Sequence, residues 1–169
     1  MSSNIKVLQV IPKLGYGGAE TGCYDIAHYL PENGCESFIV TSGGELTKFV
    51  DKKKVKLIKL PVHSKNPLLI LINTILLIGI ILFFKISIVH ARSRAPAWSC
   101  LFATKLTNRK FVTTFHGTYN FSGKFKKFYN VGLIKLLNYH YLKAELFSLG
   151  KIKINYFNKE DWSSAYRNV

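Results

Sequence analysis

KVLQVIPKLGYGGAE, residues 6–20, is the stretch of this chain that decides the fold. Its first six residues are a β-branched run of strand length, and Pro12 ends the run. A glycine-rich turn follows at residues 15–20, and from Ala19 to about Leu30 the apolar residues recur at spacings of three and four. That period puts them on one face of a helix. A strand, a glycine-rich turn and a helix in this order are typical of a parallel α/β unit.

The remainder of the chain repeats the alternation of strand and helix. Residues 55–60 (VKLIKL) alternate apolar residues with lysine, as a strand near the edge of a sheet does. Strands separated by helices indicate right-handed crossovers. The sequence therefore predicts an α/β fold with a Rossmann-like, three-layer parallel sheet and flanking helices. We expect its further strands at residues 37–41, 55–60, 86–90 and 110–115, and a helix at residues 96–106 opened by Ser93 or Arg94 with Pro96 as its first residue.

Residues 68–84 (LLILINTILLIGIILFF) form a run of 17 residues without a charge, flanked by Lys65 and Lys85. This length is at the lower limit for crossing a bilayer, so a transmembrane helix is one interpretation. The other is a crossover helix that is buried or lies at an interface. The run stands between two strands that we expect to be parallel and adjacent, and a membrane span there would separate them. Its position therefore favours the crossover helix.

Composition excludes several classes of protein. The chain has 169 residues, 24 Lys and Arg against 9 Asp and Glu, and a net charge of +15. With 48% hydrophobic residues it is not a disordered basic tail. Three widely spaced cysteines, Cys23, Cys35 and Cys100, fit a reducing cytoplasm, and the N-terminus has no secretory apolar core. The basic residues are nearly all Lys, as AT-rich codons produce, so the charge permits anionic partners without identifying one.

Three motifs at expected strand ends can carry chemistry. Gly17 and Gly18 precede a helix N-terminus, where free N–H groups suit a phosphate, although the spacing matches neither the dinucleotide fingerprint nor a P-loop. Arg92, Ser93 and Arg94, in HARSRAPAW, offer a site for phosphate or carboxylate.

The third motif is TTFHG, in which His116 ends a strand. There it is placed to donate to a sugar hydroxyl or to stabilise developing charge. No spacing of His and Cys suggests a metal site.

These three motifs, in this order and at these strand ends, resemble the N-terminal half of the retaining glycosyltransferases of family 4, which have the GT-B fold. The resemblance covers residues 5–129. VHARSRAPAWS and FVTTFHGTYNF are especially similar to bacterial members that modify lipopolysaccharide or related surface glycans. It implies one half of a GT-B fold, which shapes the acceptor side and faces a domain that holds most of a nucleotide-sugar.

The resemblance also implies roles for single residues. Gly17 and Gly18 would approach the donor diphosphate, and His116 would be the catalytic residue that contacts the transferred sugar. From their location, we place Arg92, Ser93 and Arg94 on the acceptor side. No cofactor and no metal is implied. The partners are a nucleotide-sugar and a glycan or lipid-linked acceptor.

The sequence departs from the family pattern after residue 129. Residues 130–169 are expected to be a divergent basic segment, out of frame or degraded, and no donor-binding domain follows in this sequence. The domain, residues 1–129, is then either catalytically incomplete alone or paired with a separately encoded donor domain. We expect it in the cytoplasm, peripheral at the inner face of the cell membrane with an anionic lipid surface as partner. The alternative is a basic membrane-associated protein with one membrane helix at residues 68–84. No recognised nucleic-acid motif is present, although FKKFY at residues 125–129 interleaves aromatic and basic residues.

Overall fold

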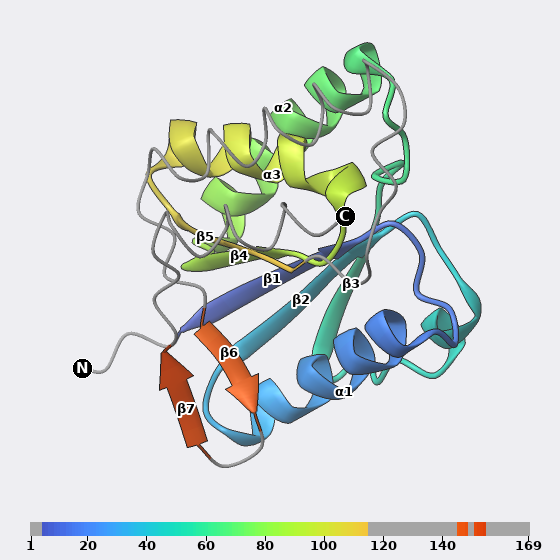
Figure 1. Cartoon of the computed structure of the whole chain (residues 1–169), viewed down its shortest axis with the longest axis vertical. Helices are drawn as coiled ribbons and strands as arrows, with labels where there is room; N and C mark the ends of the chain where they lie inside the picture. The colour runs from blue at the N-terminus through green and yellow to red at the C-terminus, as the bar shows by residue number, and fades with distance from the viewer. Residues whose placement is uncertain (1–4, 115–144, 149–150, 155–169) are drawn as a thin grey trace, which may run out of the picture. The chain divides into compact units, whose positions relative to one another are not determined.

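The structure is a computed structural model that describes residues 5–114, 145–148 and 151–154 (Figure 1). The chain divides into two compact units, residues 1–133 and 134–169. The first unit contains, in chain order, β1 (Lys6–Ile11), α1 (Gly18–Glu32), β2 (Glu36–Thr41), a 3-10 turn η1 (Glu45–Lys48), β3 (Val55–Lys59), α2 (Pro67–Phe84), β4 (Ile88–Ala91), α3 (Arg94–Thr107) and β5 (Lys110–Thr113). The second unit contains an antiparallel pair, β6 (Glu145–Ser148) and β7 (Lys151–Ile154).

The five strands of the first unit form one sheet in the order β3-β2-β1-β4-β5. All four neighbouring pairs are parallel. β1 is central, as its run of apolar residues requires, because a strand covered on both faces has no solvent side. β3 is at the edge, as its alternating lysines predicted. The α/β fold class and the Rossmann-like parallel sheet are confirmed.

Two details of the expected fold were wrong. β3 and β4 are parallel but not adjacent, because β2 and β1 lie between them. After β3 the chain crosses back over β2 and β1, and β4 joins the sheet on the other side of β1. The direction in which strands are added to the sheet therefore reverses at β1. In addition, α3 begins at Arg94, so Pro96 is its third residue and not its first. Proline is tolerated there because the first turn of a helix has no intrahelical use for its N–H groups.

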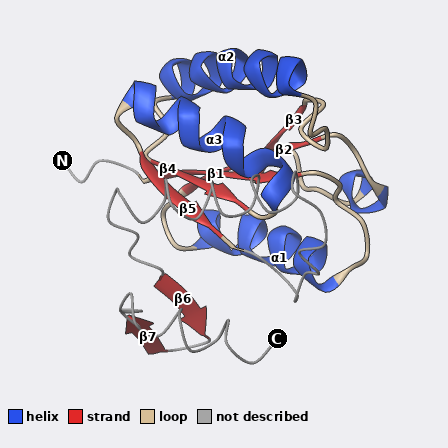
Figure 2. Cartoon of the chain, turned by 45° about the horizontal axis from the view of Figure 1, so that its top comes forward, coloured by secondary structure: helices blue, strands red, loops and turns tan. Residues whose placement is uncertain are grey.

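The helices form layers on both faces of the sheet. α1 covers one face, while α2 and α3 lie side by side on the other, with α2 outermost in the view of Figure 2. The strands supply a core of fully buried side chains between these layers, among them Leu8, Val10, Phe38, Ile39 and Val89.

α2 is the crossover helix between β3 and β4. Its start is set by Asn66, whose side chain accepts a hydrogen bond from the N–H of Leu68 at 2.9 Å, and by Pro67 in its first turn. Lys85 ends it in the left-handed conformation, with φ of 54°. Within the described residues it is the one helix long and apolar enough to cross a membrane, and 22% of that segment is buried.

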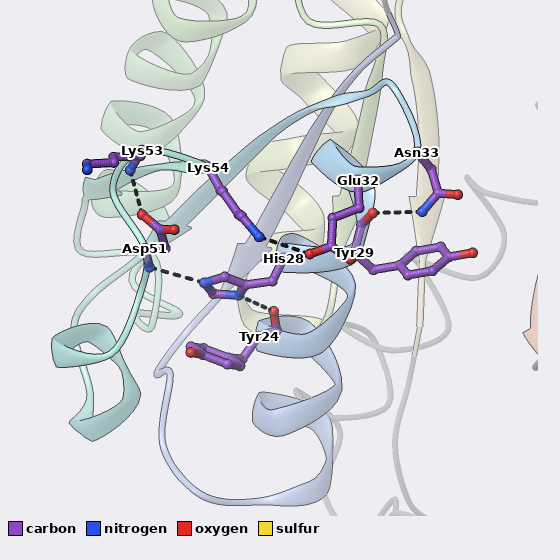
Figure 3. Close-up of polar contacts among 8 residues, drawn as sticks. All are labelled: Tyr24, His28, Tyr29, Glu32, Asn33, Asp51, Lys53 and Lys54. Atoms are coloured by element: carbon purple, nitrogen blue, oxygen red, sulfur yellow. Dashed lines mark hydrogen bonds and ion pairs between the residues drawn. The ribbon is translucent and has the colours of Figure 1, made fainter.

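α1 is tied to the loop that follows η1 (Figure 3). The backbone N–H of Asp51 donates to Nε2 of His28 at 3.1 Å, and Nδ1 of His28 lies 2.8 Å from the carbonyl oxygen of Tyr24. Nε2 is therefore the acceptor and Nδ1 carries the proton. An exposed ion pair between Lys54 and Glu32, at 2.9 Å, joins the same two segments.

Candidate functional site

The ends of β1 and β4 meet at the point where the strand order reverses. Val10 of β1 pairs with Ala91 of β4, so the loops that follow these strands leave the sheet side by side. The first leads to α1, whose N-cap is Gly17, and the second leads to α3, whose N-cap is Ser93. Open α/β sheets bind ligands in the crevice at such a switch point. Two helix N-termini, each with the partial positive charge of a helix dipole, thus begin at this edge.

The loop between β1 and α1 is held by the loop that follows β2. The N–H of Leu14 donates to the carbonyl of Gly43 at 2.7 Å, and the N–H of Leu46 donates to the carbonyl of Leu14 at 2.9 Å. Between them Gly44 has a φ of +132°, and a Cβ on it would overlap the backbone of Leu14. Glycine is required there by both the dihedral angle and the close approach. The sequence shows two adjacent glycines at this turn but not the segment that they approach.

Gly17 and Gly18 are exposed at the start of α1. A Cβ on Gly17 would meet the carboxylate of Glu20, which folds back over the N-cap as an acidic residue in the first turn of a helix does. A Cβ on Gly18 would meet no atom within 4 Å. Packing therefore does not require glycine at position 18, and the space above its backbone is open.

Arg92 lies inside the domain, with 6% of its surface exposed. Its guanidinium donates to Oε1 of Gln9 at 2.6 Å and to the carbonyl of Gly22 at 3.1 Å, which ties β4 to β1 and α1. Among the described residues no carboxylate pairs with it, and its Nε is buried without a hydrogen-bond partner. The side chain expected on the acceptor side is thus a buried cation behind the first turns of α1.

Ser93 and Arg94 are half-buried at the start of α3. Ser93 occupies the N-cap, but its hydroxyl makes no capping hydrogen bond to the first turn of this helix. Arg94 is the first residue of α3. Both lie at the same edge of the sheet as Gly17 and Gly18, because β4 is the direct neighbour of β1.

β5 ends at Thr113 and leads toward the third motif. The hydroxyl of Thr113 donates to the carbonyl of Ala91 at 3.1 Å, and Nε2 of His90 lies 3.3 Å from the hydroxyl oxygen of Thr114. His116 lies outside the described residues, so its role stays a prediction. Within the described ranges no cluster of His, Cys, Asp and Glu could hold a metal ion.

Cys23 lies beside Arg92 but is not a nucleophile. Burial raises the pKa of its thiol to about 12, and the neighbouring Arg92 guanidinium only partly offsets that effect. Sequence patterns missed this buried group of Gln9, Cys23 and Arg92, because residues 9 and 92 are far apart in the chain. The signal was a polar residue, Gln9, in the middle of an otherwise apolar strand.

Comparison with known proteins identifies the family. Residues 16–147 match Glycosyltransferase Family 4, so the match runs past residue 129, where the resemblance read from the motifs stops. A crystal structure of a glycosyltransferase from Rickettsia africae ESF-5 is similar, with 47% sequence identity and a TM-score of 0.66. The similarity covers 78% of this chain and 35% of that one, so this chain spans about a third of that protein's length.

A second crystal structure, of MurG from Acinetobacter baumannii, shares the fold at a TM-score of 0.58 and 16% identity. That similarity covers 78% of this chain and 39% of MurG. No curated protein matches the sequence. Because the family match includes more than half of the residues, the chain belongs to glycosyltransferase family 4.

Proposed function

We propose that this chain forms the acceptor-side domain of a retaining glycosyltransferase that moves a sugar from a nucleotide-sugar to a cell-surface glycan of the lipopolysaccharide type. The observation that carries the proposal is the pair of helix N-termini, those of α1 and α3, at the switch point of the sheet. Such an edge suits an anionic ligand, and the diphosphate of a nucleotide-sugar is one.

In this proposal the start of α1 receives the donor diphosphate. The bond between the sugar and the diphosphate breaks during transfer, so negative charge grows on the phosphate oxygens. The N–H groups at Gly17 and Gly18 and the positive end of α1 stabilise that charge, with the Glu20 carboxylate moved away from its place over the N-cap. The open space over Gly18 supports the assignment, since a glycine that packing does not need is explained by a ligand that comes close to the backbone.

Arg92 acts in this proposal from behind the helix. A buried cation without a carboxylate partner is costly, and an anion at the adjacent helix N-terminus lowers that cost. Its bonds to Gln9 and Gly22 fix it against α1. We therefore assign Arg92 as a positioning residue for α1 rather than a residue that touches the acceptor.

The acceptor side of the reaction falls to the start of α3. Ser93 and Arg94 bind the acceptor there. His116 donates to the transferred sugar near the carbon whose bond to the diphosphate is replaced by a bond to the acceptor. As the new glycosidic bond forms and the bond to the diphosphate breaks, the acceptor hydroxyl gives its proton to an oxygen of the departing diphosphate. We place the protein in the cytoplasm, at the inner face of the cell membrane, where it reaches lipid-linked acceptors.

Binding of diphosphate to α1 is tested on the full chain with inorganic pyrophosphate and with uridine diphosphate. Amide resonances are followed by heteronuclear NMR during the titrations. We expect shifts at Gly17, Gly18 and Ala19, with a dissociation constant on the order of 1 mM for this single domain. Gly18→Ala adds a methyl group to the open space and should weaken binding about fivefold.

Gly79→Ala is the matched control, because a Cβ on Gly79 also meets nothing within 4 Å and that residue lies in α2. It should bind both ligands as the unchanged chain does. The proposal would be wrong if Gly18→Ala bound pyrophosphate and uridine diphosphate as tightly as the unchanged chain does. It would also be wrong if the amide resonances shifted only in another part of the domain.

A further inference from the structure

α2 carries a continuous row of exposed apolar side chains along its outer side. Positions separated by three and four residues share one face of a helix, and the exposed positions of α2 follow that spacing. We call this row the apolar stripe; its members include Leu68, Leu71, Ile72, Ile75, Leu76 and Phe83, which are between 40% and 81% exposed. Gly79, also exposed, lies on the same face. Large exposed apolar patches mark interaction surfaces.

The neighbouring helix α3 extends this surface. Phe102 and Leu106 on α3 are 39% and 73% exposed. α2 and α3 lie side by side on one face of the sheet in both views (Figures 1 and 2), and the hydroxyl of Ser99 in α3 donates to the carbonyl of Ile70 in α2 at 3.2 Å.

Charge in the described part of the domain is divided along the chain. Residues 5–51 have three Lys and six Asp or Glu, a net charge of −3. Residues 52–114, which we call the basic half, have twelve Lys or Arg and no Asp or Glu, a net charge of +12. The basic half includes both α2 and α3. Lys65 and Lys85 are exposed at the two ends of the apolar stripe, and Lys105 is exposed beside Leu106.

We propose that the apolar stripe of α2, with Phe102 and Leu106 of α3, docks on the surface of an anionic lipid bilayer. α2 lies in the plane of the membrane, its apolar side chains enter the boundary between headgroups and acyl chains, and the lysines at its ends contact anionic headgroups. An in-plane helix with apolar residues on one side and basic residues around them has these properties.

The inner side of α2 excludes a helix that crosses the membrane within the folded domain. Asn73, Thr74, Leu77 and Ile81 are buried against the rest of the domain. The side-chain amide of Asn73 donates to the carbonyl of Pro61 at 2.9 Å. Withdrawal of α2 into a bilayer would break this bond and expose the side of α3 that it covers. Docking of the outer side alone leaves the domain intact.

The same charges distinguish the membrane from other occupants. A second copy seated on the apolar stripe would bring two basic halves of +12 together, which is unfavourable. A nucleic acid would pair with the lysines but would leave the apolar side chains in water. An anionic bilayer complements both features at once.

Vesicle binding of the full chain tests the proposal. Vesicles of phosphatidylcholine alone are compared with vesicles that contain about 30% phosphatidylglycerol, and bound protein is measured by sedimentation. We expect binding only to the anionic vesicles and its loss at about 0.5 M salt, where the Debye length is short. Leu71→Gln/Ile75→Gln should lower the partition coefficient at least about tenfold, because two half-exposed apolar side chains are lost.

Matched controls separate docking from general surface effects. Tyr29→Gln removes an equally exposed aromatic side chain from α1, on the opposite face of the sheet, and should bind as the unchanged chain does. Lys65→Gln/Lys105→Gln should weaken binding to anionic vesicles, whereas Lys48→Gln, exposed outside the basic half, should not. All these positions are exposed, so thermal unfolding should confirm that each variant folds.

Three results would overturn the proposal. They are wild-type binding by Leu71→Gln/Ile75→Gln, retention on the vesicles after an alkaline carbonate wash, which indicates a spanning helix, and a dimer in solution that this double substitution dissociates. Because vesicle binding needs no sugar donor, a chain that docks but does not bind uridine diphosphate would contradict the proposed function and leave the docking surface in place.

Discussion

Gly44 is the residue on which the geometry of the donor loop depends most directly. Its positive φ and its contact with Leu14 leave no room for a side chain. Gly44→Ala should therefore lower the free energy of unfolding by about 3 kcal/mol, from left-handed strain and displacement of the backbone. Urea denaturation measures the change.

Gly34→Ala measures the cost of backbone strain without a steric clash, since Gly34 has a φ of +75° and open space around the position of a Cβ. It should cost only about 1 kcal/mol. Equal losses in the two variants would show that the contact with Leu14 is not tight.

Single residues also show where sequence reasoning stops. Gly17 and Gly18 were found from sequence because a strand followed by glycines is a local pattern. The buried position of Arg92 was not, because it depends on Gln9, which is brought beside it only when β1 and β4 pair. Local patterns carry no information about such partners. His116 was singled out by its motif, and it lies outside the described residues.

At the scale of elements, His28 joins α1 to the loop before β3 through its neutral imidazole (Figure 3). His28→Leu removes the acceptor for the N–H of Asp51 and should lower the free energy of unfolding by about 1 to 2 kcal/mol. Hydrogen exchange at the Asp51 amide should become at least about tenfold faster. Tyr24→Phe, which removes only an exposed hydroxyl that donates to the carbonyl of Phe49, should leave that amide protected. Unchanged exchange in His28→Leu would show that this bond does not hold the loop.

The elements themselves were largely predictable. The five strands of the sheet and α1 and α3 lie where the β-branched runs and the helical spacing placed them, with ends that agree or differ by at most two residues. Strand order was harder, since β3 and β4 were expected to be neighbours. The residues of a strand do not determine which other strand it will pair with. The order follows from how the crossover through α2 packs, which is a property of the assembled domain.

At the scale of the whole molecule, the three thiols differ in accessibility. Cys23 and Cys100 are buried and Cys35 is partly exposed. Burial raises the pKa values of both buried thiols. A disulfide reagent at neutral pH should therefore modify Cys35 rapidly, and Cys23 and Cys100 only after unfolding in urea.

The burial of Cys23 also makes the free energy of unfolding depend on pH. Above about pH 9 the thiol of Cys23 ionises in the unfolded chain while it keeps its proton in the folded one, whose pKa is about 12. The free energy of unfolding should then fall as pH rises from 9 toward 12. Cys23→Ala should show a shallower fall in urea denaturation over that range. Rapid labelling of all three thiols in the folded chain would contradict the burial on which both expectations rest.

The central place of β1 also has a consequence for how the chain folds during synthesis. β1 pairs on one side with β2, which follows it closely, but on its other side Val7 pairs with Ile88. That second edge of β1 stays open until β4 has left the ribosome, and α2, the most apolar segment, emerges in the interval before its neighbour α3 exists. Contacts this distant in sequence form slowly, and open strand edges with uncovered apolar helices are prone to aggregate. While residues 60–90 emerge, the nascent chain therefore exposes an apolar helix and an open strand edge at the same time.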